Sequence, residues 1–247
     1  MAGKGTLGSG VASIRAWQRE QVGYQAHAEL FALWASYQFV QRNLLALRAH
    51  LDTSIDGRDI DLGERREFFV EMARHFSNFL SAAVALRDHY DRLRAKQLLS
   101  DGVQEQLDDL ARESFAGSLE LEFLTNLRNS FMHRSSSFSE HRLKTSIGVT
   151  ENSAHLGFLR ESVLAWLDWN DRMTRYIEGM DEEIWVTDIL KTYEARVGRF
   201  YPEVLTKAAI DLRPLFEEFD AALDERQTEE LGDHRFFSHL DMSWVGA

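Results

Sequence analysis

The chain contains no cysteine and only two prolines, and both absences narrow what it can be. Without thiols it forms no disulfide and holds no metal or iron–sulfur cluster through cysteine. Because Pro202 and Pro214 are the only prolines, long stretches rich in Ala, Leu, Arg, Glu and Gln run without a strong breaker. These residues are good helix formers. The composition therefore predicts a mostly helical protein, and its 44% of hydrophobic residues is enough to build a core.

No apolar run is long enough to predict a membrane span. The most apolar stretch, FALWASYQFV at 31–40, is half as long as the roughly 20 residues that a spanning helix needs. The first ten residues, MAGKGTLGSG, are rich in glycine and lack the apolar centre of a secretion signal. We therefore expect a flexible lead-in over 1–10 and a cytoplasmic protein that makes no contact with a membrane.

The formal net charge of −12 at pH 7 disfavours broad, non-specific adhesion to nucleic acid, which usually needs a basic surface. One stretch departs from this average. Residues 128–144 contain a single acid, Glu140. Their basic side chains are Arg128, Arg134, Arg142 and Lys144, together with His133 and His141. A basic island therefore lies within an acidic chain.

Apolar residues recur at intervals of three and four, which predicts amphipathic helices. The predicted helices cover about 11–51, 62–99, 103–113 and 117–134, and helical spacing resumes from 160 to 177 and from 181 to 231. The runs LKTSIGVT and SAHLGFLR alternate like strands and predict a small β-hairpin over about 143–158.

These elements predict an all-α fold, an up-and-down bundle of long antiparallel helices with the hairpin as an insertion. We expect one helical domain over 11–180. A C-terminal helical extension over 181–231 is expected to pack on the same core, and 232–247 to form a tail.

Common catalytic motifs are missing from the sequence. None of the nine histidines has Glu three residues before it, as di-iron bundles require, and HExxH is absent. The phosphate-binding patterns GxxxxGK[ST] and GxGxxG and the hydrolase pattern GxSxG are absent too. We therefore expect neither a metal nor an organic cofactor.

One polar constellation remains, in LRNSFMHR at 127–134, on a predicted helix with an apolar stripe. Arg128 precedes His133 by five residues, and Asn129 follows the Arg directly. The Arg–His interval alone arises about once by chance in such a chain, whereas requiring the Asn lowers that expectation to roughly 0.02. On an ideal helix Asn129 and His133 are i,i+4 neighbours, but Arg128 and His133 lie about 140° apart.

The stretch RNSFMH resembles the R-x4-6-H motif of the HEPN superfamily, in which a polar residue often follows the Arg. The resemblance covers about residues 30–177, and HFSNFLSAAVALRDHY at 75–90 is similar to the corresponding helix of uncharacterised bacterial HEPN-like proteins. It implies a metal-independent ribonuclease, of the kind found among toxins and antiviral effectors, that forms a homodimer through the motif helices. Some of these toxins carry a Tyr two residues after the His, where a partner nucleotidyltransferase modifies them. Ser135 stands there in this chain, so that regulation is not implied.

The resemblance implies roles for individual residues. Arg128, Asn129 and His133 would be catalytic. His133 would act as a general acid or base, and Arg128 would bind the phosphate. The residues expected to bind substrate are Asn78, Ser81, Asp88, His89, Arg134, His141, Arg142 and Lys144. The partners implied are RNA, a second copy of the chain, and an antitoxin or other regulatory protein.

Two plainer interpretations stay open. Arg128 and His133 could simply cap a helix end, where basic groups interact well with terminal carbonyls. The whole chain could instead be a non-catalytic helical module whose acidic surface binds a protein partner.

Overall fold

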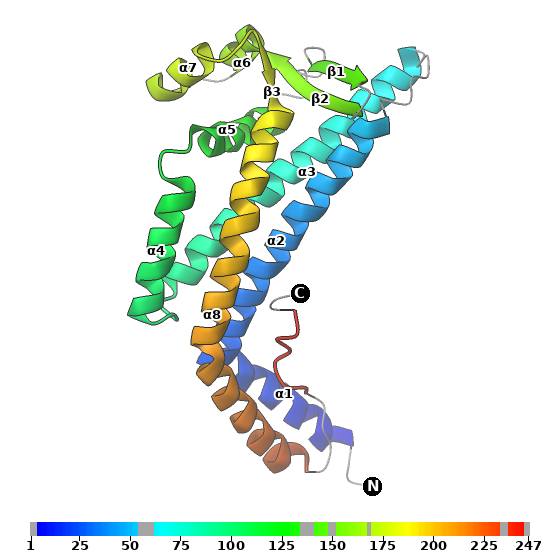
Figure 1. Ribbon diagram of the computed structural model, residues 1–247. Coiled ribbons are helices and arrows are strands. Elements are labelled where there is room, and N and C mark those ends of the chain that lie inside the picture. Colours follow the sequence, from blue (N-terminus) through cyan, green and yellow to red (C-terminus); the bar gives the residue numbers. More distant parts are fainter. Residues whose placement is uncertain are drawn as a thin grey trace. The chain divides into compact units, whose positions relative to one another are not determined.

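The computed structural model describes residues 4–53, 62–133, 141–147, 152–166, 169–232 and 237–244; of 4–7, 62–66, 129–133, 141–147, 152–154 and 166 it describes the backbone alone. Its helices are α1 Lys4–Glu20, α2 Val22–Asp52, α3 Leu62–Ala95, α4 Asp101–Phe115, α5 Leu119–His133, α6 Arg160–Trp166, α7 Asp171–Glu178 and α8 Val186–Leu231 (Figure 1). Its strands are β1 His141–Ile147, β2 Asn152–Leu159 and β3 Glu183–Trp185. The predicted fold class is confirmed: long antiparallel helices, a small hairpin and a long C-terminal helix.

The chain forms two compact units, each built from segments that are far apart in the sequence. Unit 1 combines Met1–Ala35, Asp88–Leu110 and Phe200–Ala247, and unit 2 combines Ser36–Arg87 and Ala111–Arg199. Four helices, α2, α3, α4 and α8, are continuous through the boundary and contribute to both units. The predicted division into a helical domain over 11–180 and an extension over 181–231 stays a prediction.

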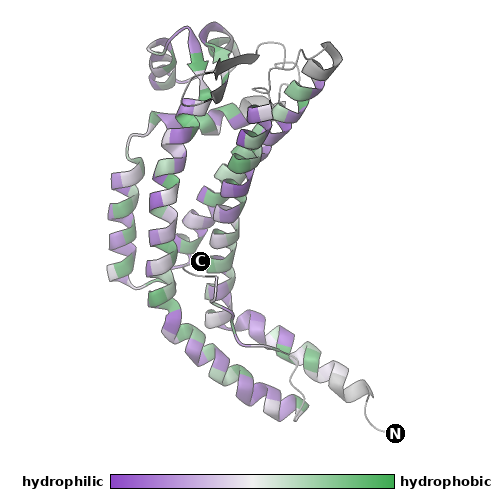
Figure 2. Ribbon diagram, turned by 45° about the vertical axis from the view of Figure 1, so that its right-hand side comes forward, coloured by the Kyte–Doolittle hydropathy of each residue, from purple (hydrophilic) through white to green (hydrophobic). Residues whose placement is uncertain are grey.

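The long helices form because each carries one apolar stripe. Val40, Leu44, Leu47 and Leu51 of α2 recur at intervals of three and four, and each is at most 2% exposed. Polar and apolar residues accordingly alternate along the long helices in Figure 2. This is the pattern of helices that pack one face against a core.

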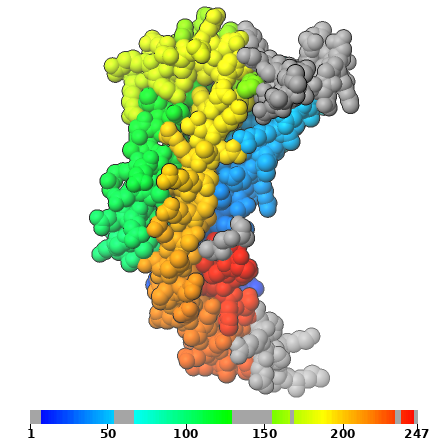
Figure 3. All heavy atoms as spheres, viewed as in Figure 1, coloured from blue at the N-terminus to red at the C-terminus, as the bar shows by residue number. Residues whose placement is uncertain are grey.

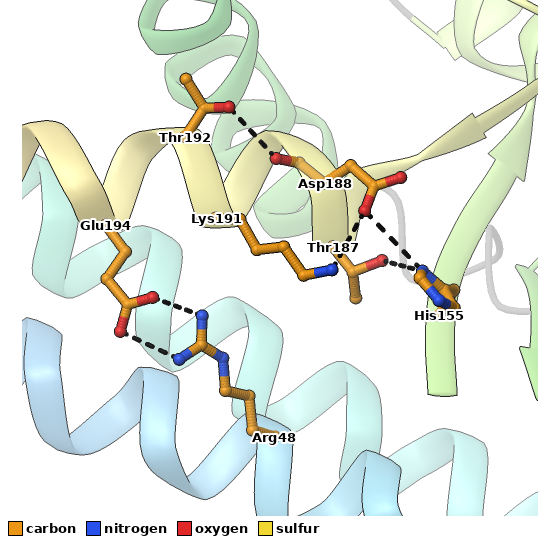
Figure 4. A network of polar contacts seen from close by, with 7 residues as sticks. All are labelled: Arg48, His155, Thr187, Asp188, Lys191, Thr192 and Glu194. Atoms are coloured by element: carbon orange, nitrogen blue, oxygen red, sulfur yellow. Dashed lines mark hydrogen bonds and ion pairs between the residues drawn. The ribbon is translucent and has the colours of Figure 1, made fainter. Parts of the chain in front are cut away.

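In unit 2, α8 packs against both α3 and α2. The rings of Phe79 on α3 and Tyr193 on α8 meet edge to face, with centroids 5.6 Å apart. Arg48 of α2 donates from both terminal nitrogens to the two carboxylate oxygens of Glu194 on α8 (Figure 4). The side chains of Arg48 and Glu194 are 41% and 31% exposed, so this ion pair fixes the pairing of the helices more than it stabilises the fold.

In unit 1, α1 and the end of α8 share an apolar cluster of Ile14, Phe219, Leu223 and Leu231. α2 approaches α8 so closely at Gly23 that an added Cβ would lie 2.4 Å from the carbonyl oxygen of Leu215.

The segment 237–244 has neither helix nor strand, as expected of the predicted tail, and it lies against α8 (Figure 3). The buried side chain of Gln227 on α8 holds its start by donating to the carbonyl of Phe237 and accepting from its N–H, at 3.2 and 3.0 Å.

Three local predictions need correction. The helix expected over 11–51 is divided at Gln21 into α1 and α2, although no Pro or Gly stands at the break. α1 begins at Lys4, within the predicted flexible lead-in, and Gly10 is buried against Leu231. Finally, Glu183–Trp185 forms strand β3, where helix was expected. These three residues become a strand only because β2 offers an edge on which they pair, and this tertiary effect outweighs local preference.

The three strands form an antiparallel sheet in the order β1-β2-β3. The hairpin is confirmed, with Lys144 opposite His155 and Arg142 opposite Gly157. Leu156, Phe158 and Ile184 lie on the face that is buried, each at most 3% exposed. The other face of the sheet is therefore the one that carries His155, Gly157 and Trp185.

Tyr90 of α3 gives a prediction for alkaline pH in unit 1. Its ring packs edge to face on Phe200, its hydroxyl donates to the carbonyl of Leu107 at 3.3 Å, and burial raises its pKa to about 12. In the unfolded chain a tyrosine titrates near pH 10. The protonated phenol therefore contributes stability that is complete below pH 10 and is lost as the pH rises toward 12, by roughly 2 kcal/mol.

We expect Tyr90→Phe to lower the unfolding free energy by about 1 kcal/mol at pH 8, because a hydrogen bond is lost. Between pH 10 and 12 the variant should lose less stability than the wild type. Urea unfolding across this pH range measures the unfolding free energy of both proteins. If it fell equally with pH in the wild type and in Tyr90→Phe, Tyr90 would not be the cause of the alkaline loss of stability.

Candidate functional site

The helix that carries the motif, α5, is fixed in unit 2 by its first half. Ser118 begins it, since its Oγ accepts the N–H of Leu121 at 3.3 Å. Phe123, Leu124 and Leu127 form its stripe, each at most 2% exposed. Phe123 also stacks on Trp169, with ring centroids 5.9 Å apart. These three apolar residues anchor the first half of α5 in the core.

One side of α5 packs on α3 and α8. Leu121, Leu124 and Thr125 of α5 line a cavity with Leu80, Ala83, Val84 and Arg87 of α3 and with Tyr193 of α8. Its volume is about 10 Å³, which holds one water molecule at most. Among these described residues the contact is therefore close-packed and leaves no room for a ligand.

Arg128 follows one turn beyond Leu124 on this same side of α5. It is half-buried, and its Nε is shielded from solvent. Its guanidinium is therefore held at the margin of the packed region rather than free in solvent.

The three motif residues do not share one side of the helix. α5 is helical from Leu119 to His133, so Arg128 and His133 lie about 140° apart around its axis, as expected from the spacing. Asn129 and His133 lie one turn apart on one side. The position of Asn129 is about 160° from that of the buried Leu127. A single α5 helix therefore presents Arg128 and the Asn129–His133 pair in different directions.

Of the α3 residues predicted to bind substrate, two belong to unit 2. Asn78 is exposed, and its position lies about 160° around α3 from Leu80, which faces α5. Ser81 is half-buried and lies about 100° from Leu80. Asn78 is therefore on the far side of α3 from the motif helix, and the structure does not bring it to Arg128.

The other two, Asp88 and His89, belong to unit 1. Asp88 is exposed and His89 half-buried. The Nδ1 atom of His89 is shielded from solvent and has no hydrogen-bond partner among the described residues.

The remaining predicted residues are basic. Arg134 lies outside the described residues, whereas His141, Arg142 and Lys144 lie on β1. The register sets these three opposite Phe158, Gly157 and His155 respectively. The basic island thus continues from α5 into the edge strand of the sheet.

A polar network on this sheet was not predicted from the sequence (Figure 4). His155 Nδ1 lies 3.3 Å from Thr187 Oγ1 and 3.8 Å from Asp188 Oδ1, and Lys191 Nζ lies 3.5 Å from the same carboxylate oxygen. The alternation of SAHLGFL could have placed His155 on the polar face of its strand. Its partners are 32 and more residues away, and no local pattern identifies them.

Within the described part of the chain, no three His, Asp or Glu residues are grouped as metal ligands would be. No helix in the same part is both long and apolar enough to cross a bilayer. Comparisons with protein-family models, with curated proteins and with solved structures found no significant match.

Proposed function

We propose that this protein is a metal-independent endoribonuclease of the HEPN-like type, acting as a toxin or antiviral defence effector. The observation that carries the proposal is the motif Arg128-Asn129-x3-His133, which lies at the end of a helix anchored in the core by other residues. The proposed reaction is attack of an RNA 2′-hydroxyl on the adjacent phosphate.

The motif contains the groups that this reaction needs. The 2′-oxygen loses its proton to a base and bonds to phosphorus, and the 5′-oxygen leaves and takes a proton from an acid. The products are a 2′,3′-cyclic phosphate and a 5′-hydroxyl. Histidine titrates near neutral pH and suits either proton transfer. The guanidinium of Arg128 holds two phosphate oxygens and stays charged throughout.

The geometry of α5 favours a site completed by a second chain. One helix carries a single histidine of the motif, and its position lies about 140° around the helix axis from that of Arg128. Two copies related by a two-fold axis would bring two Arg and two His to one cleft through the same surface of each chain. The homodimer is thus part of the proposed mechanism.

The test is to incubate the purified protein with a structured RNA in excess EDTA. We expect cleavage whose 5′ fragments end in a 2′,3′-cyclic phosphate, identified by mass spectrometry of the fragments. Cleavage that requires added Mg²⁺, or fragments that end in a 3′-hydroxyl, would contradict the mechanism.

Arg128→Lys separates the charge of the side chain from its geometry. Lysine keeps the positive charge but cannot hold two phosphate oxygens with one planar group. We expect kcat to fall at least tenfold while the melting temperature stays near that of the wild type. Arg74→Lys is a matched control, because Arg74 lies on α3 in an exposed ion pair with Glu71. Equal kcat values for Arg128→Lys and Arg74→Lys would show that Arg128 does not take part in catalysis.

The alternative function is a non-catalytic module that binds a protein partner. The net charge of −12 favours it, as do two apolar side chains exposed on α2, Phe39 at 56% and Leu45 at 63%. Growth inhibition on expression that Arg128→Ala relieves would decide for the ribonuclease. Inhibition that Phe39→Ser relieves instead would decide for the module.

A further inference from the structure

The outer face of the three-stranded sheet differs in character from the rest of the chain. Its inner face packs Leu156, Phe158 and Ile184 into the core. Residues directly opposite one another in an antiparallel pair share a face. The register of the strands therefore assigns to the outer face Arg142 and Lys144 of β1, His155 and Gly157 of β2, and Glu183 and Trp185 of β3.

The indole of Trp185 lies directly on strand β2. A Cβ added at Gly157 would be 2.6 Å from Trp185 Cε3 and 2.9 Å from its Cζ3, so only glycine leaves room for the ring there. The ring of His155 stands edge-on to the indole, with centroids 6.1 Å apart and planes at 73°. Trp185 is half-buried, which leaves part of this fixed aromatic surface open to solvent.

The net charge of the three strands is positive, although the chain is acidic. β1 supplies Arg142 and Lys144, neither β1 nor β2 contains an Asp or Glu, and the exposed Glu183 of β3 is the single acid of the three strands. The nearby Asp188 is paired with Lys191 and lies beside His155, so its negative charge is offset locally. The outer face therefore combines fixed aromatic rings with cations and suits a polyanion that has flat apolar groups.

We propose that the outer face of the sheet binds a single-stranded segment of RNA, with a base stacked on Trp185 and phosphates near Arg142, Lys144 and Lys191. An unpaired base has a free face that can stack on an exposed aromatic ring. Basic side chains beside that ring can contact the phosphates of the RNA backbone. The inference rests on the proposed function in one respect: the RNA that binds here is the substrate that the proposed ribonuclease cleaves. Residues 134–140 join α5 to β1, so the sheet begins at most roughly 28 Å from His133, within reach of one RNA molecule.

Binding is tested with a fluorescently labelled 2′-O-methyl oligonucleotide, which has no 2′-hydroxyl and cannot be cut by the proposed reaction. Fluorescence anisotropy of the full chain should give a Kd that rises roughly 5- to 100-fold in Trp185→Ala. In Trp185→Phe, which keeps an aromatic ring, it should rise much less. Circular dichroism and the melting temperature establish that the variants are folded.

A second variant tests the cations without touching the aromatic ring. Binding of single strands weakens with log salt at a slope of about −0.7 for each phosphate contact. The double substitution Arg142→Gln, Lys144→Gln should therefore make the slope shallower by about 1.4. The matched control is Lys207→Gln on α8 in unit 1, which should leave the slope unchanged.

The outcomes separate this inference from the proposed ribonuclease. Unchanged binding in both the Trp185→Ala and the double variant overturns the inference, as does equal affinity for a duplex of the same sequence. If the wild type cuts RNA while these variants bind and cut normally, the ribonuclease stands and the inference fails. If the wild type binds through this face but cuts no RNA, the binding site stands and the ribonuclease fails.

Discussion

His133→Ala is expected to abolish RNA cleavage and to leave the protein folded. Loss of a group that transfers a proton costs about 10²- to 10⁴-fold in rate, and His133 is the only titrating group of the motif near neutral pH. α5 is anchored by Phe123, Leu124 and Leu127, and alanine is a strong helix former, so the melting temperature should not fall. Single-turnover cleavage in EDTA measures the rate.

The matched control is His239→Ala. His239 is 57% exposed and pairs with Asp224 at 3.2 Å in unit 1. This variant should cleave RNA at the wild-type rate. Equal rates for His133→Ala and the wild type would exclude His133 from catalysis and with it the proposed mechanism.

Mixing two inactive variants tests whether the site is shared between chains. Arg128→Ala and His133→Ala each keep one half of the motif. After they are unfolded together and refolded, mixed dimers should recover part of the activity, because an intact Arg and an intact His then meet across the two-fold axis. No recovery would contradict a site that an Arg of one chain and a His of the other complete together.

Gly23→Ala is expected to give a large loss of stability. The new Cβ would lie 2.4 Å from the carbonyl oxygen of Leu215 and 2.7 Å from Cβ of Phe219. Backbone atoms cannot turn aside as a flexible side chain does, so α2 and α8 must separate. Overpacking of this kind costs about 2–3 kcal/mol, more than the roughly 1 kcal/mol that alanine gains over glycine within a helix. Urea unfolding at neutral pH gives the difference.

Gly198→Ala is the matched control. Gly198 also lies in a long helix, but an added Cβ there meets nothing within 4 Å. This variant should be more stable than the wild type by about 0.5–1 kcal/mol. If both variants were stabilised, the close approach of α2 to α8 at Gly23 would be wrong.

The long helices could be predicted because their signal is local. The intervals between Val40, Leu44, Leu47 and Leu51 are visible in the sequence and define a buried side without knowledge of its partner. Strand β3 could not be predicted in this way, since three residues carry little pattern and its pairing with β2 joins Ile184 to Phe158. The same holds for the contact of His155 with Thr187.

The residues of the candidate site likewise differ in how far the sequence predicts them. The motif residues on α5 are close together in the sequence, and the angle between Arg128 and His133 around the helix axis follows from their spacing alone. The substrate-binding roles predicted on α3 depend on which side of α3 faces α5, and the sequence carries no signal for that. The resemblance implies that Asn78 binds substrate, yet Leu80 and Arg87 face α5 and the position of Asn78 therefore lies on the far side of α3.

The segmented construction of unit 1 sets an order on folding during synthesis. Ser13 of α1 donates to Glu230 of α8, 217 positions further along the chain. Ribosomes add about 5 to 20 residues per second, so α1 emerges roughly 10 to 40 s before its partner exists. During that interval the side of α1 that carries Ile14 has no α8 residue to cover it. The nascent chain therefore lacks the α8 partner of α1 for most of its translation, and the contact between α1 and α8 forms only after the end of α8 has left the ribosome.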